Sequence, residues 1–166
     1  MWLPTAWGWL AILAIFLATA LAWGQWIGVH LAQSAPAAGV DAKGARILVV
    51  EGWLTAPELD AAVAVFRRGR YERVVVSGGP FEDWPAEPRF DTHAARAADY
   101  LKHHGLADAT VDAVPAPASA QDRTFLSAVV IREWAKQRGI RLDAIDLFSA
   151  GVHAYRSALV FRMALG

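Results

Sequence analysis

The sequence predicts an α/β protein with a mainly parallel sheet between two layers of helices, preceded by one transmembrane helix. Two observations predict this architecture. Between residues 46 and 166, short apolar runs alternate four times with helical patterns, which is typical of parallel strands joined by crossover helices. Near the N-terminus, an apolar stretch of 24 residues exceeds the roughly 20 residues that cross a bilayer as a helix.

Composition divides the chain into an anchor, a linker and a soluble domain. The 166 residues include 16 Lys and Arg, 16 Asp and Glu, and no Cys. All of these charges lie between Asp41 and Gly166. A net charge of zero argues against a nucleic-acid partner, because such proteins usually present a basic surface to phosphates. We expect a transmembrane anchor over residues 1–32, a linker rich in Ala, Pro and Gly over 33–45, and a domain over 46–166.

The anchor is predicted from the stretch Ala6–Val29, which only Thr19 and Gln25 interrupt. Tryptophans stand near both of its ends, about 29 Å apart along a helix, as expected for indoles in the two headgroup layers. They are Trp7, Trp9, Trp23 and Trp26. A buried core helix is one alternative, although a helix apolar on every face needs protein all round it. A cleaved signal peptide is another, although no positively charged segment precedes the stretch.

The first strand of the domain is predicted over Arg46–Val50, a continuous apolar run of the kind found in strands buried on both faces. The following helix begins at Thr55-Ala-Pro-Glu58, a capping box, and Gly69 is its expected end. Three more strand and helix units follow: Arg73–Ser77 with a helix over 91–104, Thr110–Val114 with a helix over 122–138, and Ala144–Phe148 with a helix from His153.

These units predict a Rossmann-like three-layer sandwich with the strand order 3-2-1-4. A chain that runs outward from its first strand and then returns to the other side of that strand gives this order. In open α/β sheets, ligands bind outside the carboxyl ends of the strands, near the point where the order reverses. A compact domain of this class usually has a fifth strand, so we expect that the sequence is truncated at its C-terminus.

Polar residues and glycines follow the predicted strands at this edge, and they form the candidate ligand-binding site. It consists of Glu51, Gly52, Ser77, Gly78, Gly79, Thr124, Ser127, His153 and Arg156. The pair Gly78-Gly79 either exposes backbone N–H groups as a nest for an anion or forms an ordinary turn. Glu51 either accepts a hydrogen bond from a sugar hydroxyl, binds a cation, acts as a base, or is a solvated carboxylate.

The clearest indication of an anion-binding site is the pair His153 and Arg156, which share a face at the start of a helix. The free backbone N–H groups at a helix start favour a negatively charged ligand. The alternative is a solvated Arg and a partly buried His. Thr124 and Ser127 have the same spacing and either donate to the same ligand or cap their helix.

Other site types are disfavoured by missing motifs. Neither a dinucleotide-binding glycine motif nor a P-loop occurs. Ser77 as a nucleophile with His153 as its base lacks the usual strand-to-helix motif, because Val75 stands where its first glycine belongs. We predict no metal site, because the adjacent His103 and His104 diverge on a helix.

Three short motifs in this order resemble the YdcF/SanA/ElyC family over Ile47–Gly166. They are Ser77-Gly-Gly79, Thr124-x-x-Ser127-Ala128 and His153-x-x-Arg156. The chain departs from the family pattern at Leu126 and Ser127, where the family has Glu and Asn, and at Glu51, which precedes Gly52 where the family often has a glycine-rich turn.

The resemblance implies a Rossmann-like fold and, as in SanA-like and ElyC-like members, an N-terminal anchor and a link to envelope integrity and to peptidoglycan or lipid-carrier metabolism. We therefore expect a single-pass protein of the plasma (inner) membrane with an extracytoplasmic domain. The charges Lys43 and Arg46 taken alone would favour the opposite orientation, but long domains translocate with little regard to charge.

The expected function is binding of an anionic small molecule or lipid-linked sugar phosphate in cell-envelope or peptidoglycan maintenance. The alternative is a hydrolase or transferase acting on phosphorylated or nucleotide-like substrates, with His153 or Glu51 as acid or base. The resemblance also implies S-adenosylmethionine binding as part of this alternative, because such binding is associated with YdcF. A third possibility is an interaction module without a pocket. The sequence identifies no cofactor, catalytic residue or oligomeric state.

Overall fold

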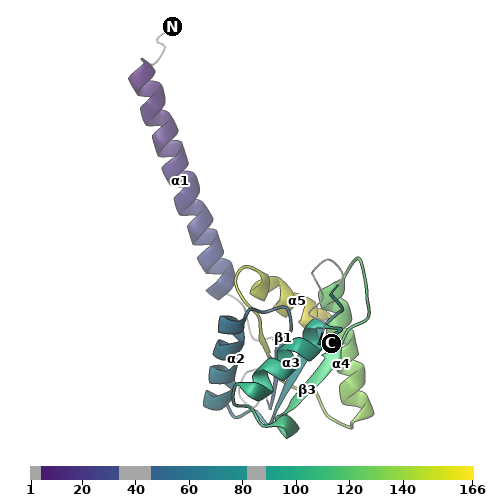
Figure 1. Cartoon of the computed structure of the whole chain (residues 1–166). Helices are drawn as coiled ribbons and strands as arrows, with labels where there is room; N and C mark the ends of the chain where they lie inside the picture. Colours follow the sequence, from purple (N-terminus) through teal and green to yellow (C-terminus); the bar gives the residue numbers. More distant parts are fainter. Residues whose placement is uncertain (1–4, 34–45, 82–88) are drawn as a thin grey trace.

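Four parallel strands form one sheet in the order β3-β2-β1-β4, so the predicted order and α/β class are confirmed (Figure 1). The computed structural model describes residues 5–33, 46–81 and 89–166. The strands are β1 (Ile47–Glu51), β2 (Arg73–Gly78), β3 (Val111–Pro115) and β4 (Ile145–Phe148). The helices of the domain are α2 (Ala56–Arg68), α3 (His93–His103), α4 (Arg123–Gln137) and α5 (His153–Leu165), and the 3-10 turn η1 (Asp108–Thr110) precedes β3.

Helices cover both faces of this sheet. On one face, Leu48 and Val50 of β1 pack with apolar residues of α2 and α3. On the other face, Val49 of β1 and Val75 of β2 pack with α4 and α5, which contribute Ile131 and Phe161. Successive residues of a strand point to opposite faces, so a strand between two helix layers must be apolar throughout. Residues 47–51 of β1 are all buried, as the continuous apolar run predicts.

The predicted capping box opens α2. The backbone N–H and the hydroxyl of Thr55 both donate to Glu58 Oε2, each at 2.8 Å. These bonds fix the loop that follows β1. Other predicted starts differ from the observed ones by one or two residues, and β1, α3 and β4 begin at Ile47, His93 and Ile145. Thr110 belongs to η1 rather than to β3, and Asp122 precedes α4 with a left-handed φ of 55°.

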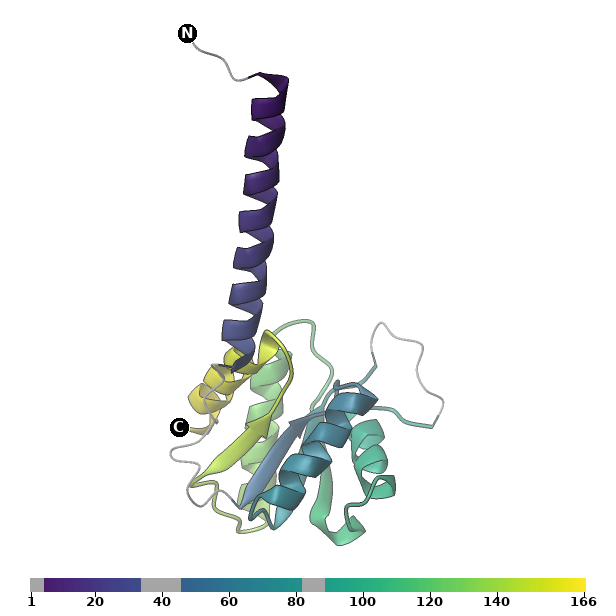
Figure 2. The same cartoon turned by 90° about the vertical axis from the view of Figure 1, so that its left-hand side faces the viewer.

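The helix α1 (Ala6–Gln33) projects away from the α/β domain (Figure 2). Its segment Ala6–Ile27 is long and apolar enough to cross a membrane, with a mean hydropathy of 1.9 and none of its most apolar window buried. The alternative of a buried core helix is therefore wrong. The predicted linker lies outside the described residues except for Gln33, which ends α1. The C-terminal end of α1 lies against α5.

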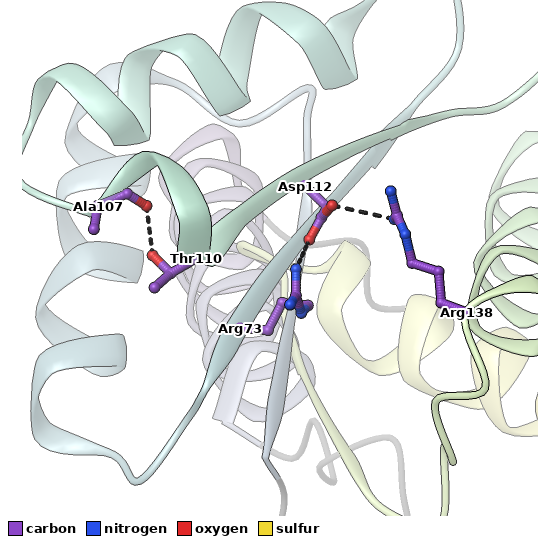
Figure 3. Close-up of polar contacts among 5 residues, drawn as sticks. All are labelled: Arg73, Ala107, Thr110, Asp112 and Arg138. Atoms are coloured by element: carbon purple, nitrogen blue, oxygen red, sulfur yellow. Dashed lines mark hydrogen bonds and ion pairs between the residues drawn. The ribbon is translucent and has the colours of Figure 1, made fainter.

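A charged cluster ties the strands together at the edge opposite to the predicted site. Asp112 on β3 accepts a hydrogen bond from Arg73 at the start of β2 and pairs with Arg138 Nη1 at 3.1 Å (Figure 3). In the adjoining turn, the Thr110 hydroxyl donates to the carbonyl oxygen of Ala107 at 2.7 Å. Asp112 thus joins β2, β3 and the end of α4 at the amino edge of the sheet.

Candidate functional site

A cavity of about 190 Å³ lies at the carboxyl edge of the sheet. Its walls come from the ends of β1 and β2, the segment after β3, and the beginnings of α3 and α4. Six of the nine residues predicted from the sequence line it: Glu51, Ser77, Gly78, Gly79, Thr124 and Ser127. The parallel topology brings them together, because Glu51 and Ser77 are register partners at the ends of adjacent strands.

The other three predicted residues lie outside the cavity wall. Gly52 is buried and its N–H donates to the carbonyl oxygen of Ser77 at 2.6 Å. His153 is exposed at the start of α5, and its ring stands edge-on to Trp53, with 5.4 Å between the ring centroids. Since Trp53 lines the cavity, His153 lies just behind one wall. Arg156 is exposed on the same helix and lines no part of the cavity.

Glu51 is the most buried charged group of the cavity, with 5% of its surface exposed. Ser157 Oγ donates to Glu51 Oε1 at 2.9 Å, whereas Oε2 has no well-formed hydrogen bond to any described residue. Burial raises the pKa of this carboxyl. The nearby polar hydrogens of Ser149, Ser157 and Trp53 and the charge of His153 lower that pKa, but by less than burial raises it. Glu51 Oε2 is therefore a buried oxygen without a hydrogen-bond partner among the described residues.

The glycines at the strand ends allow α3 to approach the sheet closely. A Cβ on Gly52 would lie 2.7 Å from the backbone carbonyl of His93, and a Cβ on Gly78 would lie 2.9 Å from His93 Cβ. Neither Gly78 nor Gly79 has the positive φ of a left-handed residue, so the pair does not form the predicted anion nest of alternating conformations. The close approach of α3 therefore requires a glycine at position 78, whereas a Cβ on Gly79 would lie 3.6 Å from its nearest neighbour, an ordinary contact distance.

His93, the first residue of α3, is a site residue that sequence reasoning missed. It lines the cavity, its ring centroid lies 4.2 Å from that of Phe81, and its Nδ1 is buried without a hydrogen-bond partner among the described residues. Burial, and then the charges of Arg96 and Arg123, lower the pKa of His93 below 6.5, so its ring is neutral at pH 7. No sequence motif surrounds His93 that could have identified it. The residue reaches the cavity only because α3 docks against the sheet.

The start of α4 gives the cavity its positive character. The first residue to donate within this helix is Leu126, whose N–H bonds the carbonyl oxygen of Asp122 at 2.9 Å. The three preceding N–H groups have no partner within the helix, and the Asp122 side chain does not cap them. Arg123 and Thr124 stand here in the wall, beside the hydroxyl-bearing Ser119. Backbone N–H groups and a guanidinium at a helix start are typical of a phosphate site.

Two larger hollows of about 470 Å³ lie elsewhere, at the amino edge of the sheet and between α2 and α3. At the amino edge, Arg46 pairs with Glu72, and Arg141 Nε lies 3.1 Å from Asp143 Oδ2. Between α2 and α3, the rings of Tyr100 and His104 stack with centroids 3.7 Å apart. In the hollow between α2 and α3 the buried Arg96 Nε also lacks a partner, but the guanidinium of Arg96 donates to the carbonyl oxygens of Gly52 and Leu54. The carboxyl-edge cavity combines two buried atoms without partners among the described residues, Glu51 Oε2 and His93 Nδ1, with the start of α4. It is therefore the candidate ligand site.

No cluster of three or more His, Cys, Asp or Glu side chains that could hold a metal occurs among residues 5–33, 46–81 and 89–166. No family model, curated protein or solved structure matches the chain. The family resemblance therefore stays a prediction.

Proposed function

We propose that this chain is a membrane-anchored protein whose Rossmann-like domain binds a sugar phosphate, free or lipid-linked, in cell-envelope or peptidoglycan maintenance. One observation carries the proposal. In a single cavity, the cationic start of α4 with Arg123 stands together with the buried carboxyl of Glu51. These two groups suit the two chemical parts of one ligand, a phosphate and a polyhydroxylated ring.

The phosphate would lie at the first turn of α4. There the backbone N–H groups of the first turn, the Arg123 guanidinium and the Thr124 hydroxyl are all hydrogen-bond donors. Hydrogen bonds from a guanidinium to a phosphate are charge-assisted and about twice as strong as neutral ones. His93 is neutral at pH 7 and adds a ring nitrogen without adding a second positive charge.

The sugar would lie towards the end of β1. Glu51 Oε2 is available to a ligand hydroxyl, and Ser77 and Ser127 add hydroxyl groups to the same wall. At about 190 Å³, the cavity is smaller than the roughly 300–1,000 Å³ that encloses a drug-sized ligand. This size favours a phosphate and a single sugar ring over a nucleotide or S-adenosylmethionine.

The membrane part of the proposal is supported by α1 and by its placement. The helix is apolar over Ala6–Ile27, and it projects from the side of the domain where the carboxyl ends of the strands lie (Figure 2). A ligand attached to a membrane lipid would approach the cavity from this side. The family resemblance supports an extracytoplasmic domain on the inner membrane.

A second candidate function is hydrolysis or transfer at the same phosphate. It is favoured by the place of Glu51 in the cavity wall and by burial, which raises the pKa of this carboxyl in the direction that suits a general acid. The test is release of inorganic phosphate from a hexose 1-phosphate by the full chain in detergent. Turnover by the wild type that is lost in Glu51→Gln would support the enzyme proposal. Absence of turnover by the wild type would exclude it.

The binding proposal is tested by the thermal unfolding of the full chain with glucose 1-phosphate or inorganic phosphate. A ligand at 100 times its dissociation constant stabilises the wild type by about 2.7 kcal/mol. Arg123→Gln should lose this stabilisation, whereas the matched control Arg156→Gln should keep it, because Arg156 lies outside the cavity wall. Stabilisation that survives in Arg123→Gln and disappears in Arg156→Gln would move the anion site to the start of α5 and overturn the assignment.

A further inference from the structure

Exposed apolar side chains gather on one helix of the α/β domain. Tyr155, Leu159 and Met163 of α5 are 44%, 46% and 70% exposed, and Val152 directly before the helix is 49% exposed. Their spacing of three or four residues places them on one side of α5. The opposite side, with Ala158 and Phe161, is buried against the sheet. Outside α1, the other described large apolar side chains with comparable exposure are Trp53 and Phe125.

The charge of α5 is also distinctive. It carries two arginines, Arg156 and Arg162, which are both exposed, and it contains neither Asp nor Glu. The helices α2, α3 and α4 each contain at least one acidic residue. A helix with an exposed apolar side, flanking arginines and no acid is typical of elements that lie in the headgroup layer of an anionic membrane.

The position of α5 matches this chemistry. The C-terminal end of α1 lies against α5, and both figures of the whole chain show α5 on the side of the domain from which α1 projects (Figures 1 and 2). Near that end of α1, Trp23 and Trp26 are exposed, as expected for indoles at a headgroup layer. The domain element beside the predicted membrane boundary is therefore the one with the apolar side.

We propose that α5 lies on the surface of an anionic phospholipid bilayer, with Tyr155, Leu159 and Met163 in the headgroup layer and Arg156 and Arg162 on lipid phosphates. This inference rests on the proposed insertion of α1. A second copy of the chain fits this side less well, because two α5 helices packed about a twofold axis would bring four arginines together without an acidic partner from either helix.

Contact of α5 with the bilayer would also bring the ligand cavity close to the lipid headgroups. Ser157, on the buried side of α5, donates to Glu51 in the cavity wall. The start of α5 contacts the same wall through His153 and Trp53. A bilayer-bound α5 therefore holds the carboxyl edge of the sheet close to the headgroups, where the phosphate of a lipid-linked ligand lies.

Because the chain has no cysteine, single-cysteine variants can carry a fluorescent label at chosen sites. The full chain is reconstituted in vesicles of phosphatidylcholine and phosphatidylglycerol, with a nitroxide quencher on the lipid or iodide in the water. Labels at Leu159→Cys and Met163→Cys test the proposed surface. The label at Arg68→Cys, exposed at the end of α2, is the matched control, and the label at Leu13→Cys reports on insertion of α1.

We expect the lipid quencher to act on the labels at positions 13, 159 and 163, and iodide to act on the label at position 68. Replacing both Arg156 and Arg162 by Gln, or omitting phosphatidylglycerol, should reduce lipid quenching at position 159 and leave position 13 unchanged.

If the lipid quencher acted on the label at position 13, but only iodide acted on the label at position 159, the proposed bilayer contact of α5 would be wrong and the anchor would stand. Absence of lipid quenching at position 13 would instead overturn the proposed anchor. If the label at position 159 were shielded from both quenchers, a protein contact would cover α5 and the proposal would be wrong. A dependence of that shielding on protein density would identify a second copy.

Discussion

Ser157 Oγ donates a hydrogen bond of 2.9 Å to Glu51 Oε1, across 106 residues of sequence. The bond joins the second turn of α5 to the carboxyl end of β1, and both side chains are buried. The bond gives one of the two carboxyl oxygens of Glu51 a hydrogen-bond donor. The packing of α5 and the proton affinity of Glu51 are therefore linked.

Removing this hydroxyl should destabilise the domain. Ser157→Ala leaves a buried carboxyl oxygen without its donor, which costs about 1–3 kcal/mol. The pKa of Glu51 should rise further, because the hydroxyl favours the charged form. Urea unfolding of the full chain in detergent measures the loss. In a double-mutant cycle, Ser157→Ala should cost less when Glu51 is already Ala, and an equal cost in both backgrounds would show that the bond contributes no stability.

The buried carboxyl should make stability fall with rising pH. The folded pKa of Glu51 lies above its ordinary value of 4.5, so the folded state holds this proton more tightly than the unfolded state does. The resulting stability is fully present below about pH 4.5 and is lost as the pH rises through the folded pKa. Glu51→Gln should therefore become more stable relative to the wild type between acidic and neutral pH. A constant difference between the two unfolding free energies would contradict the raised pKa.

His93 should contribute with the opposite sign. Its folded pKa lies below 6.5, so protonation is easier in the unfolded chain. Stability from this residue is present above about pH 6.5 and is lost as the pH falls from there through the folded pKa. His93→Gln should remove this loss, which can be measured by comparing unfolding of the two chains at pH 7.5 and pH 5.5. If both chains lost the same stability over this range, His93 would have an ordinary pKa.

The three glycines at the ends of β1 and β2 should differ in their tolerance of a methyl group. Gly52→Ala places Cβ 2.7 Å from the His93 backbone, and Gly78→Ala places it 2.9 Å from His93 Cβ. Overpacking of this kind costs about 1–3 kcal/mol. Gly79→Ala is the matched control, because its nearest neighbour would be 3.6 Å away. Thermal unfolding should rank Gly79→Ala as the most stable of the three, and equal stability would exclude the close contact of α3.

The fold was predictable because each of its signals is local. The apolar run of β1, the capping box at Thr55 and the glycine that ends α2 are all readable within a few residues of sequence. The strand order then follows from the handedness and spacing of the crossovers. The helix α1 was predictable for a similar reason, because length and apolar composition alone define it.

The candidate site was predictable only in part. Residues directly after a strand, such as Glu51 and Ser77, are placed at the cavity by the parallel topology. His93 and Arg123 reach it because of how α3 and α4 dock, and docking depends on contacts far apart in the sequence. For the same reason, the helical spacing of His153 and Arg156 predicts that they share a side of α5 but does not predict that both lie outside the cavity wall.

The central claim is tested most directly by the structure of the full chain with bound glucose 1-phosphate. The account predicts the phosphate at the first turn of α4, within hydrogen-bonding distance of the Arg123 guanidinium, and a sugar hydroxyl on Glu51 Oε2. Electron density for the phosphate beside His153 and Arg156, with the carboxyl-edge cavity left empty at saturating ligand, would contradict it.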